Sequence, residues 1–283
     1  MGNVSHRFVP GRQLKFAGFV LTAFSVSWIF WIPAALFGQV ELQPVYYLLY
    51  LLGGFGPTIA GVFSIRRERD MAAEKDIIHR LTGIRLINGP WYVFIFALFP
   101  LLAITVIVIY RLTRGIMPSL PSLNGFTGQI GDFLTLMVIA VQSFILGPLS
   151  EEIGWRGYAL DNLQKRFRPI TASLILGLLW GLWHFPLFFI KGSMYYEWGT
   201  GTWLFWLFFI RMIALTIIMT VVYNANHRSI LSAILLHFMF NFTFVFLQPA
   251  PIEIHGYGTL ILVLLAGFLF LRFKNIPEIQ PGN

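Results

Sequence analysis

Apolar residues come in long uninterrupted runs along this chain, and short polar stretches separate them. Most runs are about 20 residues long, the length that an α-helix needs to cross a bilayer. They do not alternate between apolar and polar positions over about ten residues, as the strands of a membrane barrel do. The sequence therefore predicts an all-α, polytopic membrane protein that forms a single integral membrane domain over residues 1–283. Eight transmembrane helices are predicted, at residues 14–37, 44–65, 91–110, 133–149 (continuing into the next helical turns), 170–190, 203–223, 230–247 and 257–271.

The composition agrees with a lipid environment. Hydrophobic residues make up 57% of the chain and charged residues 11%, whereas a soluble domain carries about 25% charged residues. The formal net charge of +8 does not indicate a nucleic-acid partner, because the positive residues lie in short loops between the spans. Membrane lipid is the expected partner. Cysteine is absent, which excludes disulfides, thiolate metal sites and a cysteine nucleophile.

The distribution of Lys and Arg predicts the orientation. With a cytoplasmic N-terminus, 16 of them fall on cytoplasmic segments and three (Arg111, Arg114 and Lys191) on the other side. Since cytoplasmic loops carry an excess of Lys and Arg, both termini are expected in the cytoplasm. The mixed charges of the loop at 66–85 predict a solvated amphipathic helix at the membrane surface. The small residues at 53–61 predict close helix packing.

Ionisable side chains at membrane depth are costly, so they are candidates for a functional site. The first cluster, at residues 150–156, contains Glu151, Glu152 and Arg156 directly after an apolar run. On a helix, Glu152 and Arg156 stand four residues apart with the acid first, the favourable order for an ion pair. Glu151 points about 100° away from Glu152 around the helix, with 3.6 residues per turn, and is expected to keep a freer carboxylate. The alternative is a helix end with solvated charges.

Two further clusters carry histidine. His184 lies inside an apolar run, and Trp180 shares its helix face and is expected to wall a pocket. His237 and Asn241 project from one face of the seventh predicted span. The alternatives are a buried neutral histidine bonded to a carbonyl group for His184, and hydrogen bonding between helices for His237 and Asn241.

Together these clusters favour hydrolytic chemistry, if the three helices bring them to one depth. A general base must reach water, and a tetrahedral oxyanion needs hydrogen-bond donors. Glu151 and His184 are candidates to activate water, with His237 and Asn241 at the oxyanion. Glu151, His184 and His237 are also a candidate zinc set, with metal-bound water as the nucleophile. The sequence leaves both mechanisms open, and it contains no His-Glu-x-x-His or Gly-x-Ser-x-Gly motif and no phosphate-binding loop.

The three clusters resemble the motifs of the CPBP family, which comprises CAAX proteases and bacteriocin-processing proteins and is related to the type II CAAX prenyl endopeptidase. The matching region covers residues 133–247 and lies on the fourth, fifth and seventh predicted spans. Phe is common at the aromatic position of the second motif, where this chain has Trp. The family's motifs Glu-Glu-x-x-x-Arg, aromatic-x-x-x-His and His-x-x-x-Asn stand here as Glu151, Glu152 and Arg156, as Trp180 and His184, and as His237 and Asn241.

This resemblance implies an eight-helix fold with a cytoplasm-accessible peptidase site inside the membrane. It implies Glu151 as general base assisted by His184, with His237 and Asn241 at the oxyanion, and it favours metal-free hydrolysis over zinc. The implied substrate is a peptide or a membrane-anchored protein. The expected location is the cell membrane, namely the cytoplasmic membrane of a prokaryote. The residues to which it gives a supporting role are Glu152 and Arg156.

Two other classes of function remain open. A proton-coupled transporter would use buried Glu and His as a relay, although no inverted repeat is detected. A non-catalytic immunity or chaperone-like membrane protein would keep the motifs for packing. Arg211 interrupts the sixth predicted span, and either pairs with an acid inside the bundle or marks a span that begins nearer residue 212. The histidines expected to be solvated, in termini or loops, are His6, His79, His227 and His255.

Overall fold

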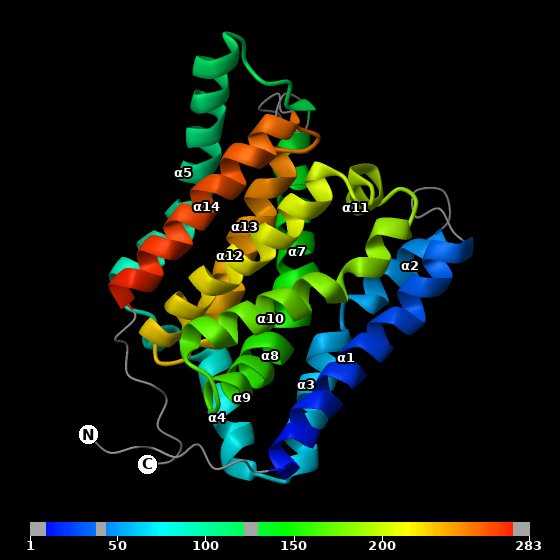
Figure 1. Ribbon diagram of the computed structural model, residues 1–283, viewed down its shortest axis with the longest axis vertical. Coiled ribbons are helices and arrows are strands. Elements are labelled where there is room, and N and C mark those ends of the chain that lie inside the picture. Colours follow the sequence, from blue (N-terminus) through cyan, green and yellow to red (C-terminus); the bar gives the residue numbers. More distant parts are fainter. Residues whose placement is uncertain (1–9, 38–43, 122–129, 274–283) are drawn as a thin grey trace.

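The protein is a bundle of helices, most of which run between its two ends (Figure 1). The computed structural model describes residues 10–37, 44–121 and 130–273, and the regular elements of this part are all helical. His6, Arg7 and Lys274 lie outside the described residues. The longer helices are α1 (Pro10–Phe37), α2 (Pro44–Gly53), α3 (Gly56–Glu68), α4 (Met71–Thr82), α5 (Gly89–Arg114), α7 (Ile130–Phe144), α10 (Pro169–Trp183), α12 (Trp203–Ala225), α13 (Ile230–Phe246) and α14 (Ile252–Phe273). Shorter elements are η1 (Ile84–Leu86), η2 (Ile145–Leu149), α8 (Ser150–Gly154), η3 (Trp155–Leu160), α9 (Asp161–Gln164), η4 (Phe185–Phe189) and α11 (Met194–Trp198).

The predicted membrane spans are confirmed in part. Within the described residues, six helices are long and apolar enough to cross a membrane, and the pair α2 and α3, bent by 41°, adds a seventh if it forms one span. The bend follows from the glycines at its centre and from Pro57 in the first turn of α3. The remaining predicted span, α13, has 17 residues, so it is about 26 Å long against a hydrocarbon core of about 30 Å. The structure therefore shows an all-helical multi-pass membrane protein, with six or seven candidate spans where eight were predicted.

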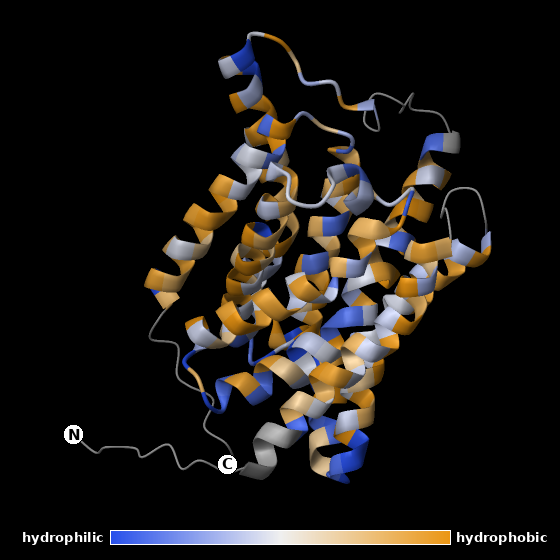
Figure 2. Ribbon diagram, turned by 45° about the vertical axis from the view of Figure 1, so that its right-hand side comes forward, coloured by the Kyte–Doolittle hydropathy of each residue, from blue (hydrophilic) through white to orange (hydrophobic). Residues whose placement is uncertain are grey.

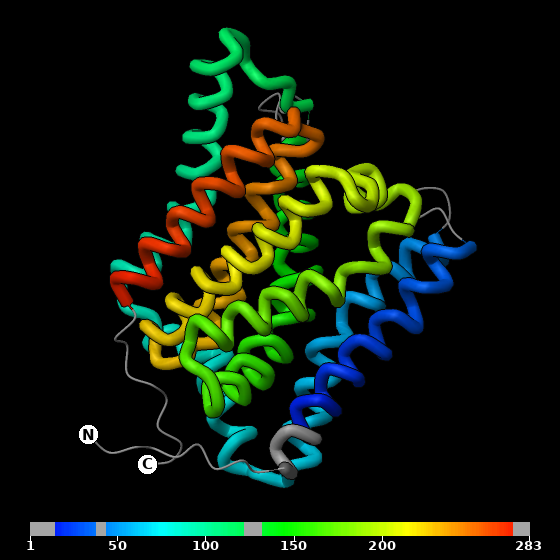
Figure 3. The backbone as a smooth tube through the Cα atoms, viewed as in Figure 1, coloured from blue at the N-terminus to red at the C-terminus, as the bar shows by residue number. Residues whose placement is uncertain are grey.

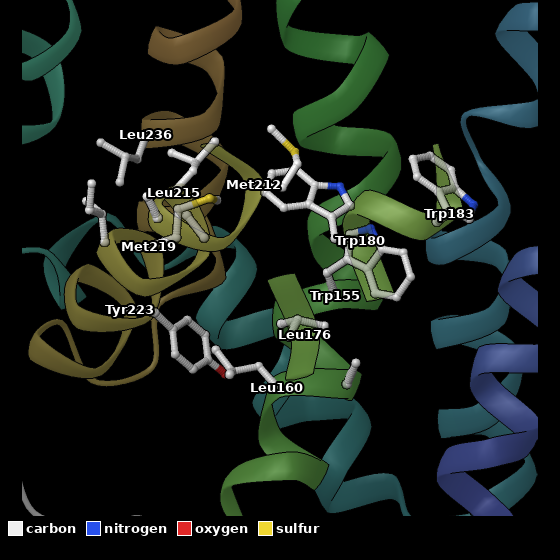
Figure 4. Close-up of a cluster of buried hydrophobic side chains, with 14 of the residues drawn as sticks. Trp155, Leu160, Leu176, Trp180, Trp183, Met212, Leu215, Met219, Tyr223 and Leu236 are labelled. Carbon is white, nitrogen blue, oxygen red and sulfur yellow. The ribbon is translucent and has the colours of Figure 1, made fainter. Parts of the chain in front are cut away.

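Apolar residues cover most of the length of the helices, and hydrophilic residues gather near the helix ends, with a few at mid-bundle (Figure 2). The most deeply buried spans are those of α10 and α12. Figure 3 traces α10 from the end of the bundle that holds α9 toward the end that holds α11. Its residues Trp180 and Trp183 lie in the core together with Trp155 of η3 and with Met212 and Met219 of α12 (Figure 4). The hydrophobic core thus surrounds the predicted second motif.

The small residues at 53–61, at the end of α2 and in the first turns of α3, allow close packing, as predicted. A β-carbon added to Gly61 of α3 would lie 2.9 Å from the Cα atom of Gly154 in α8, a separation that does not occur between real atoms of this kind. A β-carbon on Gly154 would overlap the carbonyl oxygen of Pro57. Because both glycines lack side chains, α3 and α8 touch backbone to backbone, and this contact fixes the helix that carries the two glutamates.

The loop at 66–85 contains the predicted amphipathic helix, α4, but its Arg80 is buried rather than solvated. Arg80 forms an ion pair with Asp161 at 3.2 Å and donates a hydrogen bond to the hydroxyl of Tyr223. Arg228 also pairs with Asp161. Although burial alone lowers the pKa of Arg80, the neighbouring Tyr223 and Asp161 oxygens raise it above its ordinary value. This network anchors α4 to α9 and α12.

Arg211 and His255 lie in environments that were not predicted. Arg211 lies inside α12, which begins at Trp203, and no carboxylate of the described residues lies within ion-pair distance of it. The span therefore does not begin near residue 212, and the expected acidic partner is not among those residues. His255 is buried in α14 rather than solvated, and its ring contacts Trp198 and Phe244. A single sequence does not reveal these contacts, because the partners come from distant elements.

Candidate active site

The chain breaks its helical path just before the two glutamates. Leu146 has φ −89° and ψ 102°, and Gly147 has φ +110° and ψ −86°, so the helix that was expected to run on past residue 149 is interrupted. Gly147 tolerates a positive φ because it has no β-carbon, and the following Pro148 disfavours a helical conformation at the residue before it. The break leaves the carbonyl oxygen of Leu146 outside the helical hydrogen-bond pattern, where Asn241 donates to it at 3.4 Å.

Glu152 is the centre of a buried polar cluster. Its Oε1 atom accepts hydrogen bonds from Arg156 Nη1 at 2.9 Å and from His237 Nδ1 at 2.7 Å, and neither Glu152 nor Arg156 is exposed. The predicted ion pair between Glu152 and Arg156 is therefore present. The bond to His237 was not predicted. The guanidinium of Arg156 also stacks over the Trp180 ring, 4.6 Å from its centroid.

Glu151 has a different environment from Glu152. It is 5% exposed, and its Oε2 atom accepts a hydrogen bond of 2.6 Å from Trp180 Nε1. In the described part of the chain it forms no ion pair. One carboxylate of the predicted pair is thus neutralised by arginine, and the other accepts from the neutral indole N–H of Trp180 and faces a cavity.

His184 follows the last residue of α10, and its orientation is set by the same tryptophan. Its Nδ1 atom lies 2.7 Å from the carbonyl oxygen of Trp180. Since a carbonyl can only accept, Nδ1 carries the proton, and in the neutral ring Nε2 is left as an acceptor. Trp180 was predicted as a supporting residue that walls the pocket. In the structure it holds Glu151 through its indole nitrogen and His184 through its carbonyl oxygen.

The predicted site residues lie around one cavity of about 500 Å³. Glu151 reaches it from α8, and His237 and Asn241 reach it from α13; His184 reaches it from the end of α10. Glu151, His184 and His237 are each less than one tenth exposed. Residues of α2, α7 and α11 complete the wall, among them Tyr50, Gln142 and Tyr195.

The candidate zinc set does not assemble. Among the described residues, no three His, Asp or Glu side chains lie close enough to hold one metal ion. The donors are turned to other partners instead, since His237 Nδ1 faces Glu152 and His184 Nδ1 faces a carbonyl. In the described part of the chain, Glu151, His184 and His237 therefore line the cavity as separate polar groups.

Comparison with known proteins agrees with this geometry. Residues 133–243, which contain all three motifs, match the family model of the type II CAAX prenyl endopeptidase Rce1-like proteins. The chain is also similar to CAAX prenyl protease 2 of Methanococcus maripaludis, with 32% identity over 225 residues that cover 79% of this chain and 81% of that protein. A relationship of this extent includes the bundle as well as the motifs. The chain therefore belongs to the Rce1-like type II CAAX prenyl endopeptidase family of multi-pass membrane proteases.

Proposed function

We propose that this protein is an intramembrane endopeptidase in which Glu151 and His184 activate a water molecule for attack on a peptide bond. The observation that carries the proposal is the convergence of Glu151, His184, His237 and Asn241 on one cavity inside an apolar bundle. Polar side chains from three separate helices have no reason to meet there for packing alone, because burying them is costly.

The proposed base is built on Trp180. Its indole N–H fixes one oxygen of the Glu151 carboxylate, and its carbonyl oxygen fixes the His184 ring with Nε2 as an acceptor. Two acceptors at one cavity can hold a water molecule by both of its protons, which orients a lone pair of the water toward a substrate carbonyl. As the water attacks, Glu151 takes the proton and later delivers it to the leaving amine.

The proposed oxyanion site is on the opposite helix, α13. Asn241 donates only a long bond of 3.4 Å to Leu146, and its amide group has a second N–H. His237 donates from Nε2 only when its ring carries two protons, because its Nδ1 atom already donates to Glu152. Both donors would act on charge that develops in the transition state.

Glu152 and Arg156 are proposed as positioning residues. Arg156 neutralises the buried Glu152, and Glu152 in turn holds the His237 ring. Without Arg156, Glu152 would be a buried carboxylate with one histidine, and the orientation of that histidine would no longer be fixed.

We also propose that α13 is an eighth span and that both termini are cytoplasmic. Helices α5, α7 and α12 pack around α13, so a helix somewhat shorter than the bilayer is shielded from lipid. The proposed location is the cytoplasmic membrane of a prokaryote. From the name of the methanococcal relative, we propose a peptide or membrane-anchored protein substrate that is cleaved near its C-terminus.

The test is peptide cleavage by purified protein in lipid vesicles. The probes are a farnesylated peptide that ends in Cys, two aliphatic residues and Met, and the same peptide without the farnesyl group. Glu151→Gln, His184→Ala and His237→Ala are each expected to lower kcat/KM by about 10²- to 10⁴-fold. The matched controls Glu197→Gln and His79→Ala change exposed residues outside the cavity and should retain activity. Wild type that cleaves neither peptide, or the three variants cleaving like wild type, would contradict the proposal.

A further inference from the structure

Arg211 is a buried cation without a counter-charge in the described residues. It is 5% exposed in the middle of α12, and the ion pairs of this part of the chain do not include it. A charged group inside a membrane bundle is expensive unless it is paired. Arg211 therefore differs from Arg80 and Arg156, which each have a carboxylate partner.

The neighbours of Arg211 satisfy only part of its hydrogen-bonding capacity. Its Nε and Nη2 atoms both donate to Thr259 Oγ1, at 3.3 and 3.2 Å. A guanidinium has five N–H donors, and the two hydrogen bonds to Thr259 use two of them. The other neighbours are aromatic faces, with the guanidinium carbon 5.2 Å from the Phe244 centroid and 5.9 Å from the Trp198 centroid. These contacts hold a cation in place, but they do not neutralise it.

A small cavity adjoins Arg211. It has a volume of about 40 Å³, and Arg211, His255 and Phe244 are among the residues that line it. A single water molecule needs about 15 Å³ on this measure, so there is room for a group the size of a carboxylate, and little for a phospholipid headgroup.

Phe244 connects this cavity with the active site. Phe244 and Gln248 line both the small cavity and the large one that contains Glu151. The Phe244 ring therefore borders both cavities and lies 5.2 Å from the Arg211 guanidinium carbon.

The spacing along α13 sets the length of substrate peptide that fits between the proposed oxyanion site and Phe244. Phe244 stands three residues beyond Asn241 and seven beyond His237, which is about 4 to 11 Å along the helix axis at 1.5 Å per residue. An extended peptide covers about 3.4 Å per residue. A tail of two or three residues after the cleaved bond would therefore end near Phe244, whose ring contacts the Arg211 guanidinium.

We propose that Arg211 is the residue that binds the C-terminal carboxylate of the substrate and so sets how many residues lie between the cleaved bond and that end. The inference rests on the proposed function and adds a recognition site to it. The carboxylate would reach Arg211 past the edge of the Phe244 ring and supply the missing counter-charge. Such a site accepts any short tail with a free carboxylate, with or without a lipid on the residue before the cleaved bond.

The experiment compares two forms of the farnesylated peptide, one with a free C-terminal carboxylate and one with a C-terminal amide. The wild-type protein in vesicles is expected to prefer the carboxylate form by about 30-fold or more in kcat/KM, the lower range for truncating one partner of a buried charge pair. Arg211→Gln should reduce this ratio to about threefold or less. Arg211→Lys, which keeps the charge, should restore part of the preference. Lys191→Gln, a change of an exposed cation at the α11 end, should keep the wild-type ratio.

Several results would overturn the inference. The inference is overturned if the wild-type protein cleaves both peptides equally. This result needs no variant, so it decides the question even if Arg211→Gln does not fold. An undiminished ratio in Arg211→Gln would also overturn the inference. An Arg211→Gln loss that is equal for both peptides, and appears only in vesicles containing phosphatidylglycerol, would assign the cation to a lipid phosphate instead. Failure of the proposed function is distinguishable, because wild type would then cleave neither form or Glu151→Gln would cleave like wild type.

Discussion

Gly147 links the backbone of the chain to the geometry of the site. Its φ of +110° is unfavourable for any residue with a side chain, and a β-carbon there would lie 2.6 Å from Asn241 Nδ2 and 3.3 Å from His237 Nε2. The change Gly147→Ala therefore has two costs. Holding alanine in such a conformation costs about 1–3 kcal/mol of stability. The methyl group also displaces the Asn241 amide by about 1 Å, and a shift of that size costs about 10²-fold in rate.

The assay is cleavage of the farnesylated peptide together with thermal unfolding of the same preparation. Gly115→Ala is the matched control, because Gly115 has φ +73° but no atom within 4 Å of the added carbon. It should lose a similar amount of stability and keep its rate. Equal rates for Gly147→Ala and Gly115→Ala would refute the reasoning, since the donors on α13 would then not need their observed positions.

Three other predictions follow from buried contacts. Glu152→Gln should lower the free energy of unfolding by about 3–5 kcal/mol, because it leaves a buried arginine uncompensated. The control Glu253→Gln, at an exposed ion pair, should leave the Tm unchanged. Equal Tm values for the two variants would contradict this prediction. Gly154→Ala should lower the Tm, because the new methyl overlaps the Pro57 carbonyl. The control Gly267→Ala, with no atom within 4 Å of the added carbon, should raise stability by about 0.5–1 kcal/mol. A Gly154→Ala variant more stable than Gly267→Ala would be inconsistent with the packing of α3 on α8. Treatment with a zinc chelator should change the cleavage rate less than twofold, and loss of activity that added zinc restores would show that a metal is used.

The sequence predicts features that depend on neighbouring residues. Helices follow from the long apolar runs, and the pair formed by Glu152 and Arg156 follows from their spacing of four residues. Close packing at Gly61 follows from the run of small residues around it. In each case the pattern and its physical consequence lie within a few turns of one helix.

Contacts between distant elements are not predicted in this way. Glu152 and His237 are 85 positions apart, and no property of either segment indicates that one orients the other. The two roles of Trp180 depend on where α8 packs. The same holds for Arg211. An acidic partner was expected, but the rings that contact its guanidinium belong to Trp198 and Phe244, which come from other elements.

A double-variant cycle tests most directly whether Glu151 and His184 act on the same water molecule. The measurement is kcat/KM for the farnesylated peptide with wild type, Glu151→Gln, His184→Ala and the double variant. If both side chains serve one proton transfer, the double variant should be no slower than the slower single variant, within about threefold, because residues that act as a unit are not additive. Losses that multiply in the double variant would show that the two residues act independently, and the shared water site would be wrong.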